Sequence, residues 1–372
     1  MAQARTRFAV QEESITLTVG GTIYSGWTEV EVTRGIDRMA GNFHISVTEG
    51  WAGTGSPVPW QIKPFSPCTV AIGRDLVLTG YVDAYEPGYS ATAHHVAIRG
   101  RSKTEDLVDC APEVKGGQFS GYRLDAIARA ICALFGIGVV VETDVGDPFP
   151  DATVERAETA YAYLERLCRM RGVLACDDSA GNLVLTRAGS QRGASALVEG
   201  ENILAASATF DAHKRFSKYI IRGQHGITAE YDEVATDIEA AAADSTCPRY
   251  RPHVSMAESQ LSPAEAKERA MWQAVYATGR AIRLDVTCQG WRQADGSLWT
   301  LNRIHPVTSP RLALDRDLLV VSTTFSLKGG EGRRTRLSLG PAEGYTPDPA
   351  QVRHRRGHGN GGGNWHDIKG IK

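Results

Sequence analysis

The sequence has no pair of cysteines in CxxC spacing. Its seven cysteines, an odd number in 372 residues, are scattered along the chain at positions 68, 110, 132, 168, 176, 247 and 288. A zinc ribbon needs closely spaced cysteine pairs and a disulfide framework needs an even set, so neither is indicated. Most of these cysteines are expected to be small buried apolar residues.

The sequence also lacks a long apolar run. The longest, Ala130–Val141, contains two glycines and is shorter than the roughly 20 residues that a membrane-spanning helix needs. The first ten residues are followed by a polar stretch and include no apolar signal core. We therefore expect no membrane-spanning segment and a chain that is made and kept in the cytosol, unless other machinery carries it out.

Charge of one sign is absent as well. The formal net charge is −2, with 42% hydrophobic and 23% charged residues, which is the composition of an ordinary soluble globular protein. No global basic field is available to recruit nucleic acid or an anionic membrane. At this length we expect two or three domains, each with its own core.

Catalytic motifs are missing too. The patterns GxSxG, HExxH and GxxxxGK[ST] do not occur. Residues 357–362 match GxGxxG, but they lack the preceding strand and following helix of a dinucleotide site. His354 and His358 have a metal-binding spacing only if they lie on a helix, which the surrounding glycines disfavour. We predict no catalytic, cofactor-binding or metal-binding residues, and hence no enzyme.

Two carboxylate pairs, Asp177 with Asp178 and Asp144 with Asp147, are candidates for a glycosidase-type acid and base. Such a pair needs one desolvated and one exposed carboxyl group. Asp177 and Asp178 are instead predicted to lie in a polar hairpin turn, and Asp144 and Asp147 have no stronger claim. The tryptophans are interpreted as core and interface anchors rather than a sugar-stacking platform; they stand at positions 27, 51, 60, 272, 291, 299 and 365.

Residues 15 to about 100 read as short strands separated by turn residues. Gly20-Gly21 fits a two-residue hairpin turn between Ile15–Val19 and Thr22–Trp27. Many short strands at this spacing favour a small barrel or sandwich. This pattern predicts a first β domain.

Helical spacing of apolar residues follows, in 124–135 and 160–170. Ser120 is a candidate cap for the first helix, and Gly136 and Gly172 are the expected stops. A hairpin across residues 177–182 should complete a small α/β module.

Strands return from Asn202 onward, with one helix among them. Ser262-Pro263-Ala264-Glu265 has capping-box spacing with proline at the first helical position, and the helix should end at Gly279. Beyond Pro341 the sequence becomes glycine-rich and mildly basic, as in a tail.

A weak internal repeat links the two β-rich regions. Residues 60–100 and 299–340 both begin with a tryptophan segment and contain Arg-Asp-Leu, at Arg74–Leu76 and Arg316–Leu318. Short β segments can look alike by chance. If the repeat is real, the chain contains two related barrels with an α/β module between them.

Several segments, taken in order, resemble the baseplate hub proteins of contractile-tailed phages, the Mu-like hub and late-control tail protein family. The similarity runs from about Ile15 to Pro341 and rests on an ordered set of residues, which comprises Trp27 with 41–43, 80–83, 100–103 with 106–109, 165–167 with Gly172, 181–187, 223–224, 269–272 and 298–299. No catalytic residue carries over from this resemblance.

The resemblance implies an α+β, mainly β fold: two related small β-barrels with an inserted α/β module, ring-forming. We expect a homotrimer that joins the sixfold tail tube, or a tube initiator, to the threefold spike, surrounded by baseplate wedge proteins. DNA would pass through its channel without specific binding, and the protein would be assembled in the host cytoplasm and reside in the virion baseplate. The expected divisions are 1–104 (first barrel), 105–199 (inserted module), 200–344 (second barrel, with a helix at about 263–278) and 345–372 (tail).

Two other functions remain open at this point. A tail-tip peptidoglycan hydrolase would act on cell-wall substrate, although no lysozyme-like insertion with a suitable acid is visible. A β-rich carbohydrate-binding module would bind a glycan through an exposed tryptophan. Monomeric behaviour would favour either alternative over the hub.

Overall fold

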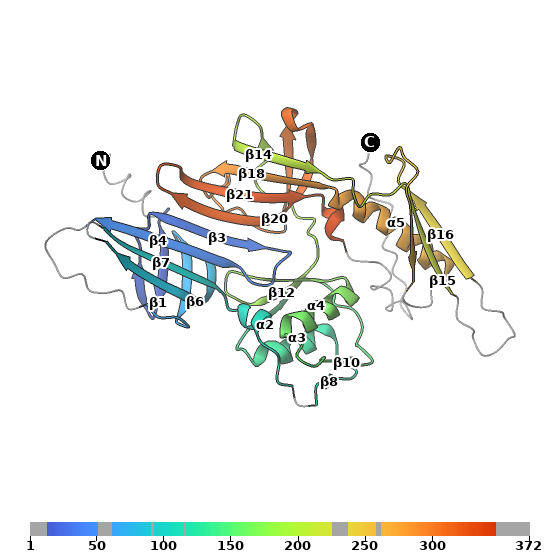
Figure 1. Cartoon of the computed structure of the whole chain (residues 1–372), viewed down its shortest axis with the longest axis horizontal. Coiled ribbons are helices and arrows are strands. Elements are labelled where there is room, and N and C mark those ends of the chain that lie inside the picture. Colours follow the sequence, from blue (N-terminus) through green and yellow to red (C-terminus); the bar gives the residue numbers. More distant parts are fainter. Residues whose placement is uncertain are drawn as a thin grey trace.

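The computed structural model describes residues 13–50, 62–90, 93–114, 116–224, 237–257 and 262–346 (Figure 1). Strands predominate over the four α-helices in this part of the chain, so the predicted α+β, mainly β class is confirmed. The strands form one 13-stranded sheet and three small sheets.

The first β-rich region contributes seven strands to the large sheet. The alternating burial of β1 (Ile15–Val19) places Leu17 in the core, and the turn to β2 uses Gly20 and Gly21 at positive φ, as predicted. The other strands are β2 (Thr22–Tyr24), β3 (Glu29–Gly35), β4 (Asn42–Gly50), β5 (Pro67–Ile72), β6 (Asp75–Tyr89) and β7 (Ala93–Ser102).

The second β-rich region extends the same sheet. Its strands are β13 (Leu197–Val198), β14 (Ile203–Phe210), β18 (Ile282–Gln289), β19 (Ile304–Ser309), β20 (Leu314–Lys328) and β21 (Gly332–Gly340), with the 3-10 turn η1 (Pro310–Leu312) before β20. The regions join where β20 pairs antiparallel with β3, from Ser322 opposite Gly35 to Leu327 opposite Val30. The strand order is β14-β18-β21-β20-β3-β4-β7-β6-β5-β1-β2, with β19 beside β20.

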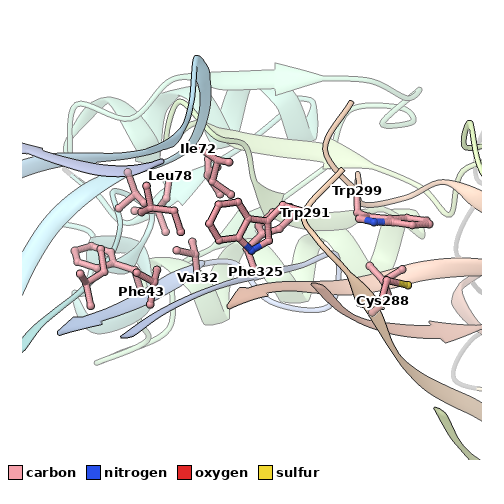
Figure 2. Close-up of a cluster of buried hydrophobic side chains, with 14 of the residues drawn as sticks. Val32, Phe43, Ile72, Leu78, Cys288, Trp291, Trp299 and Phe325 are labelled. Carbon is pink, nitrogen blue, oxygen red and sulfur yellow. The ribbon is translucent and has the colours of Figure 1, made fainter. Parts of the chain in front are cut away.

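One apolar cluster serves both regions (Figure 2). Val32, Phe43 and Leu78 from the first lie in the same core as Trp291 and Phe325 from the second. Burying each such side chain contributes about 1.5–3 kcal/mol. The ladder of described strands is an open path from β14 to β2, so the two barrels expected from the sequence are not seen there as closed strand rings.

The internal repeat corresponds to a repeated strand order. The first repeat is β3-β4-β7-β6-β5 and the second is β14-β18-β21-β20-β19, each entirely antiparallel. The long strands β6 and β20 both have 15 residues, and each has a bulge, between Val82 and Ala84 in one and between Val320 and Ser322 in the other. Ala84 and Ser322 are therefore equivalent. The shared Arg-Asp-Leu motif is not, because Asp75 begins β6 whereas Asp317 lies inside β20.

The middle module has its own core, formed by three helices packed with small sheets. Thr159 caps α4 through the Ala162 N–H, and Gly172 ends it at φ 58°, as predicted. The predicted cap Ser120 is wrong: Arg123 is the N-cap residue of α3, since a turn at Gly121 intervenes. The elements are α2 (Glu105–Asp109), β8 (Gln118–Phe119), α3 (Leu124–Ala133), β9 (Val139–Val141), β10 (Ala152–Thr153), α4 (Ala160–Arg171), β11 (Leu174–Asp177) and β12 (Leu183–Thr186).

A helix-on-sheet unit lies at one end of the molecule (Figure 1). It consists of β15 (Lys218–Gln224), β16 (Asp237–Ala243), β17 (Pro252–Met256) and α5 (Pro263–Arg280). The capping box of Ser262 and Glu265 forms as predicted. Gly279 does not end α5, because it lies inside the helix against Gly344 of η2 (Ala342–Tyr345), where an added Cβ would be 2.3 Å from the Gly344 nitrogen.

Candidate assembly surfaces

Asp178 has the turn chemistry expected of it. Its carboxylate accepts hydrogen bonds from the Asn182 backbone N–H at 2.9 Å and from the Asn182 side-chain amide at 2.8 Å. It therefore closes the hairpin between β11 and β12.

Asp177 differs from the prediction, because it is the last residue of β11 and is buried. Its carboxylate accepts from the Gly41 N–H at 3.0 Å and from Arg34 Nε at 3.3 Å, and its carbonyl accepts from the Arg34 guanidinium at 2.6 Å. Asp177 thus attaches the middle module to β3 and the segment after it. The sequence carries no local signal for such a contact between distant segments.

The remaining catalytic candidates do not come together as a site. Asp144 accepts from the Gly146 N–H at 3.0 Å, and the Asp147 carbonyl accepts from Arg171 at 2.9 Å. His354, His358 and the glycine motif at 357–362 lie outside the described residues. Within the described ranges, no group of three or more His, Cys, Asp or Glu side chains could hold a metal ion.

One charged cluster was not anticipated. Arg101 of β7 lies 2.9 Å from Asp83, 2.9 Å from Glu105 and 2.8 Å from Asp109. Burial, with repulsion from Asp83 next in size, raises the pKa of the Glu105 carboxyl to about 8. Because Asp83 is on β6 and both other carboxylates are on α2, the cluster ties the large sheet to the middle module.

The tryptophans within the described ranges confirm the core interpretation. Trp27, Trp291 and Trp299 are buried, the last two in the cluster of Figure 2. Trp291 donates to the Ser326 carbonyl at 3.0 Å. Trp272 stacks on Tyr276 at 4.8 Å and donates to the Thr346 carbonyl at 3.2 Å. Tryptophans 51, 60 and 365 lie outside the described residues.

The large sheet has a polar face opposite its core. Hydroxyl side chains gather where the repeats meet, and Thr33 and Thr324 are hydrogen-bonded through their hydroxyls at 2.9 Å. Two arginines of this face have carboxylate partners, Arg99 with Glu86 and Arg283 with Asp285. The strand registers place in one row across the sheet Gln289, Arg334, Ser326, Glu31, His44 and Arg99.

No helix in the described part of the chain combines the length and apolar character needed to cross a membrane. Three features of the structure are suited to assembly: a polar sheet face, a sheet that spans both repeats, and a middle module held to it by Asp177 and Arg101.

Three family models match the chain in succession. Residues 14–102 match the N-terminal part of Mu phage baseplate assembly protein GpP-like proteins, residues 104–187 match the second domain of gp44-like baseplate hub proteins, and residues 262–348 match the fourth domain of GpP.

Individual relatives agree with these models. The chain is 34% identical over 360 residues to the baseplate hub protein gp44 of Escherichia phage Mu, covering 94% of each. The crystal structure of the 43 kDa tail protein of prophage MuSo2 from Shewanella oneidensis is similar at a TM-score of 0.80 with 36% identity, covering 90% of this chain and 100% of that one. A tail protein from Neisseria meningitidis shares the fold, with a TM-score of 0.74, 21% identity and coverage of 90% and 98%. The chain belongs to the family of Mu-like phage baseplate hub proteins, structural proteins of the phage tail.

Proposed function

We propose that three copies of this chain form a ring that joins the sixfold tail tube to the threefold spike. The observation that carries the proposal is the repeated strand order within one chain, β3-β4-β7-β6-β5 followed by β14-β18-β21-β20-β19. Three chains with two similar units each would present six similar units to the tube. The same ring would present threefold symmetry to the spike.

The polar face of the large sheet is the proposed wall of the channel. A channel through which DNA slides should not hold phosphates strongly, since each lysine or arginine contact with a phosphate adds to affinity. On this face Arg99 and Arg283 are paired with carboxylates, and serine and threonine hydroxyls lie where the repeats meet. Arg334 and Arg336 of β21 lie on the same face without a carboxylate partner among the described residues. DNA would pass without specific binding.

The domain division expected from the sequence is retained as a proposal. It assigns a first barrel to 1–104, an inserted module to 105–199, a second barrel to 200–344 and a tail to 345–372. Apart from Met39, the core of the middle module is formed by residues between 107 and 185, which supports the second division. Tyr345 and Thr346, the first two residues of the proposed tail, contact α5 through Arg280 and Trp272.

The proposed partners are the spike below, the tail tube or its initiator above, and wedge proteins around the ring. The proposed location is the tail baseplate of the virion, after assembly in the host cytoplasm. As a structural hub the protein would have no enzymatic activity, and the similarity to proteins named for a structural role supports this.

Electron microscopy of the purified chain with the spike protein of the same phage tests the proposal. We expect rings with a central opening and a spike attached to one face. Particles without an opening, or rings that never bind the spike, would contradict it. Cell-wall cleavage or glycan binding by the pure chain would support the alternatives instead.

A further inference from the structure

The edge of β20 that lies opposite β21 is paired along its length, whereas the equivalent edge of β6 is paired only in its first part. The first part of β20 pairs with β19, up to Leu319 opposite Ile304, and its later part pairs with β3 from Ser322 onward. In the first repeat, β5 covers β6 up to Tyr81, and Val82 bonds to the segment before β5. From Asp83 to Gly88, no described strand pairs with that edge of β6.

The strand at the opposite end of the path also has an open edge. Of the described strands, only β18 pairs with β14. Natural edge strands are usually short or carry charges or proline, which prevents unwanted pairing. β14 has eight residues, ILAASATF, without a charge or a proline, and its Leu204 and Phe210 side chains are 47% and 58% exposed. Its sequence therefore suits a strand that is covered in the assembly.

The repeat makes β14 the counterpart of β3. Val32 on β3 lies opposite Phe43, which lies opposite Gly100, the residue that faces Val82 before the bulge. In the second repeat, Ala208 on β14 lies opposite Leu284, and Leu284 lies opposite Leu339. Leu339 faces Val320, the residue before the bulge of β20. Ala208 is thus equivalent to Val32, as Ala84 is to Ser322.

We infer that β6 of one copy pairs with β14 of the next copy, in the same way that β20 pairs with β3 inside each chain. This inference rests on the proposed trimer. The β20–β3 register, transferred through the equivalences, places Glu86 opposite Thr209 and Tyr85 opposite Phe210. The contact is head-to-tail, the type that closes a ring when the rotation fits.

Strand direction supports this pairing. Seven antiparallel pairs lead from β14 to β6, so β6 runs opposite to β14. Rotation about a ring axis keeps the direction of each strand along that axis, so β6 meets the neighbouring β14 antiparallel. The other end strand, β2, has only three residues and would meet β14 parallel, the less stable arrangement.

Side-chain chemistry fits the transferred register. Phe210 lies on the core face of β14 and is exposed in the isolated chain. Tyr85 on β6 packs against the core. Paired across strands, the two rings would cover each other. On the polar face, the Thr209 hydroxyl would donate a hydrogen bond to the Glu86 carboxylate. The equivalent position in the β20–β3 pairing inside the chain has the Thr33–Thr324 hydrogen bond. Pro87 has no N–H, so the β6–β14 ladder would have one hydrogen bond fewer than the β20–β3 ladder, at the position equivalent to Phe325.

Disulfide trapping tests this register. The variant Glu86→Cys/Thr209→Cys is prepared with Cys110→Ser and Cys247→Ser, because these two native thiols are not buried. Directly opposite strand residues have Cα separations that a disulfide can bridge. After mild oxidation, we expect covalent dimers and trimers on a denaturing gel. Glu86→Cys alone and Thr209→Cys alone should each remain monomeric on that gel.

Two controls make the result decisive. Thr33→Cys/Thr324→Cys should form the equivalent bond inside one chain, which shows that this junction geometry supports a disulfide. Glu86→Cys/Ala208→Cys shifts the register by one residue and puts the two side chains on opposite faces, so it should not cross-link.

Light scattering of the same samples separates the two proposals. If the Glu86→Cys/Thr209→Cys variant is a trimer that fails to cross-link, while the internal control succeeds, the β6–β14 pairing is overturned and the proposed ring is left intact. A monomer overturns the proposed trimer and the pairing together. A covalent trimer supports both.

Discussion

The two repeats share strand order, strand direction and a bulged 15-residue strand, yet they are built into the molecule differently. In the second repeat, β20 is paired along its length, with β19 and then with β3. In the first, the equivalent later part of β6 has an edge that no described strand pairs with. We infer from this difference that the later part of β6 is paired in the assembly as β20 is paired with β3 inside the chain.

The connections between equivalent strands differ as well. β3 leads to β4 through a short segment, whereas β14 leads to β18 through the unit formed by β15, β16, β17 and α5. The second repeat therefore contains a helix-on-sheet unit at a position where the first has a short turn segment. Changes in this unit should leave the first repeat unaffected.

The largest expected effect comes from comparing the equivalent residues Phe325 and Pro87. Phe325 is buried opposite Val32, so Phe325→Ala should lower the free energy of unfolding by about 3–5 kcal/mol. Pro87 is exposed at the open edge, and Pro87→Ala should change the stability of the monomer by about 0.5 kcal/mol or less. Urea unfolding followed by tryptophan fluorescence measures both, and equal losses would remove the difference between the two junctions.

Gly279 gives the next largest effect. Glycine to alanine inside a helix usually stabilises by about 0.5–1 kcal/mol. Here the new Cβ would overlap the Gly344 backbone, so Gly279→Ala should instead cost about 1–3 kcal/mol. Thermal unfolding of Gly279→Ala beside Met271→Ala, an exposed position on the same helix, measures the effect. Stabilisation by Gly279→Ala would show that α5 and η2 do not approach so closely.

The cap of α5 should matter less. Ser262→Ala removes the hydrogen bond to the Glu265 N–H and should cost about 1 kcal/mol. Ser262→Asp keeps an acceptor at the cap and serves as the matched control. If thermal melting shows the same loss for both variants, the stabilisation does not come from the cap.

A further expected effect depends on pH and is specific to the first repeat, where Arg101 stands at the position that Gly340 occupies in the second. The pKa of Glu105 in the folded chain, about 8, is above its ordinary value of 4.5. The folded state therefore holds the proton more tightly, a stabilisation that is complete below about pH 4.5 and is lost as the pH rises through 8.

Glu105→Gln stays neutral and should not show this loss. The melting temperature of the unaltered chain should thus fall relative to that of Glu105→Gln between pH 5 and pH 8.5. Asp109→Asn, which changes an exposed member of the same cluster, is the control. Parallel profiles for the unaltered chain and Glu105→Gln would contradict the raised pKa.

Local features of the fold were predictable because their causes are local. The Gly20-Gly21 turn, the Gly172 stop and the Ser262 capping box each depend on a few neighbouring residues. The internal repeat was also visible, although its Arg-Asp-Leu match aligned residues that are not structurally equivalent.

Features that depend on distant segments were not predictable. The pairing of β3 with β20 joins residues almost 300 positions apart, and no periodicity reports such a partner. The sequence predicted a turn position for Asp177, because its partners Arg34 and Gly41 come from a distant region of the chain. The sequence predicted a helix stop at Gly279, because no sequence pattern reports the close approach of the Gly344 backbone. The family came from an ordered set of residues along the chain, not from any single site.

The most direct test of the account is the mass of the purified chain in solution, measured by light scattering. A chain of 40.2 kDa should give particles of three times that mass, with one species across a range of concentrations. A species that stays at 40.2 kDa would contradict the ring, because the edges of β14 and β6 that no other described strand covers would then have no partner.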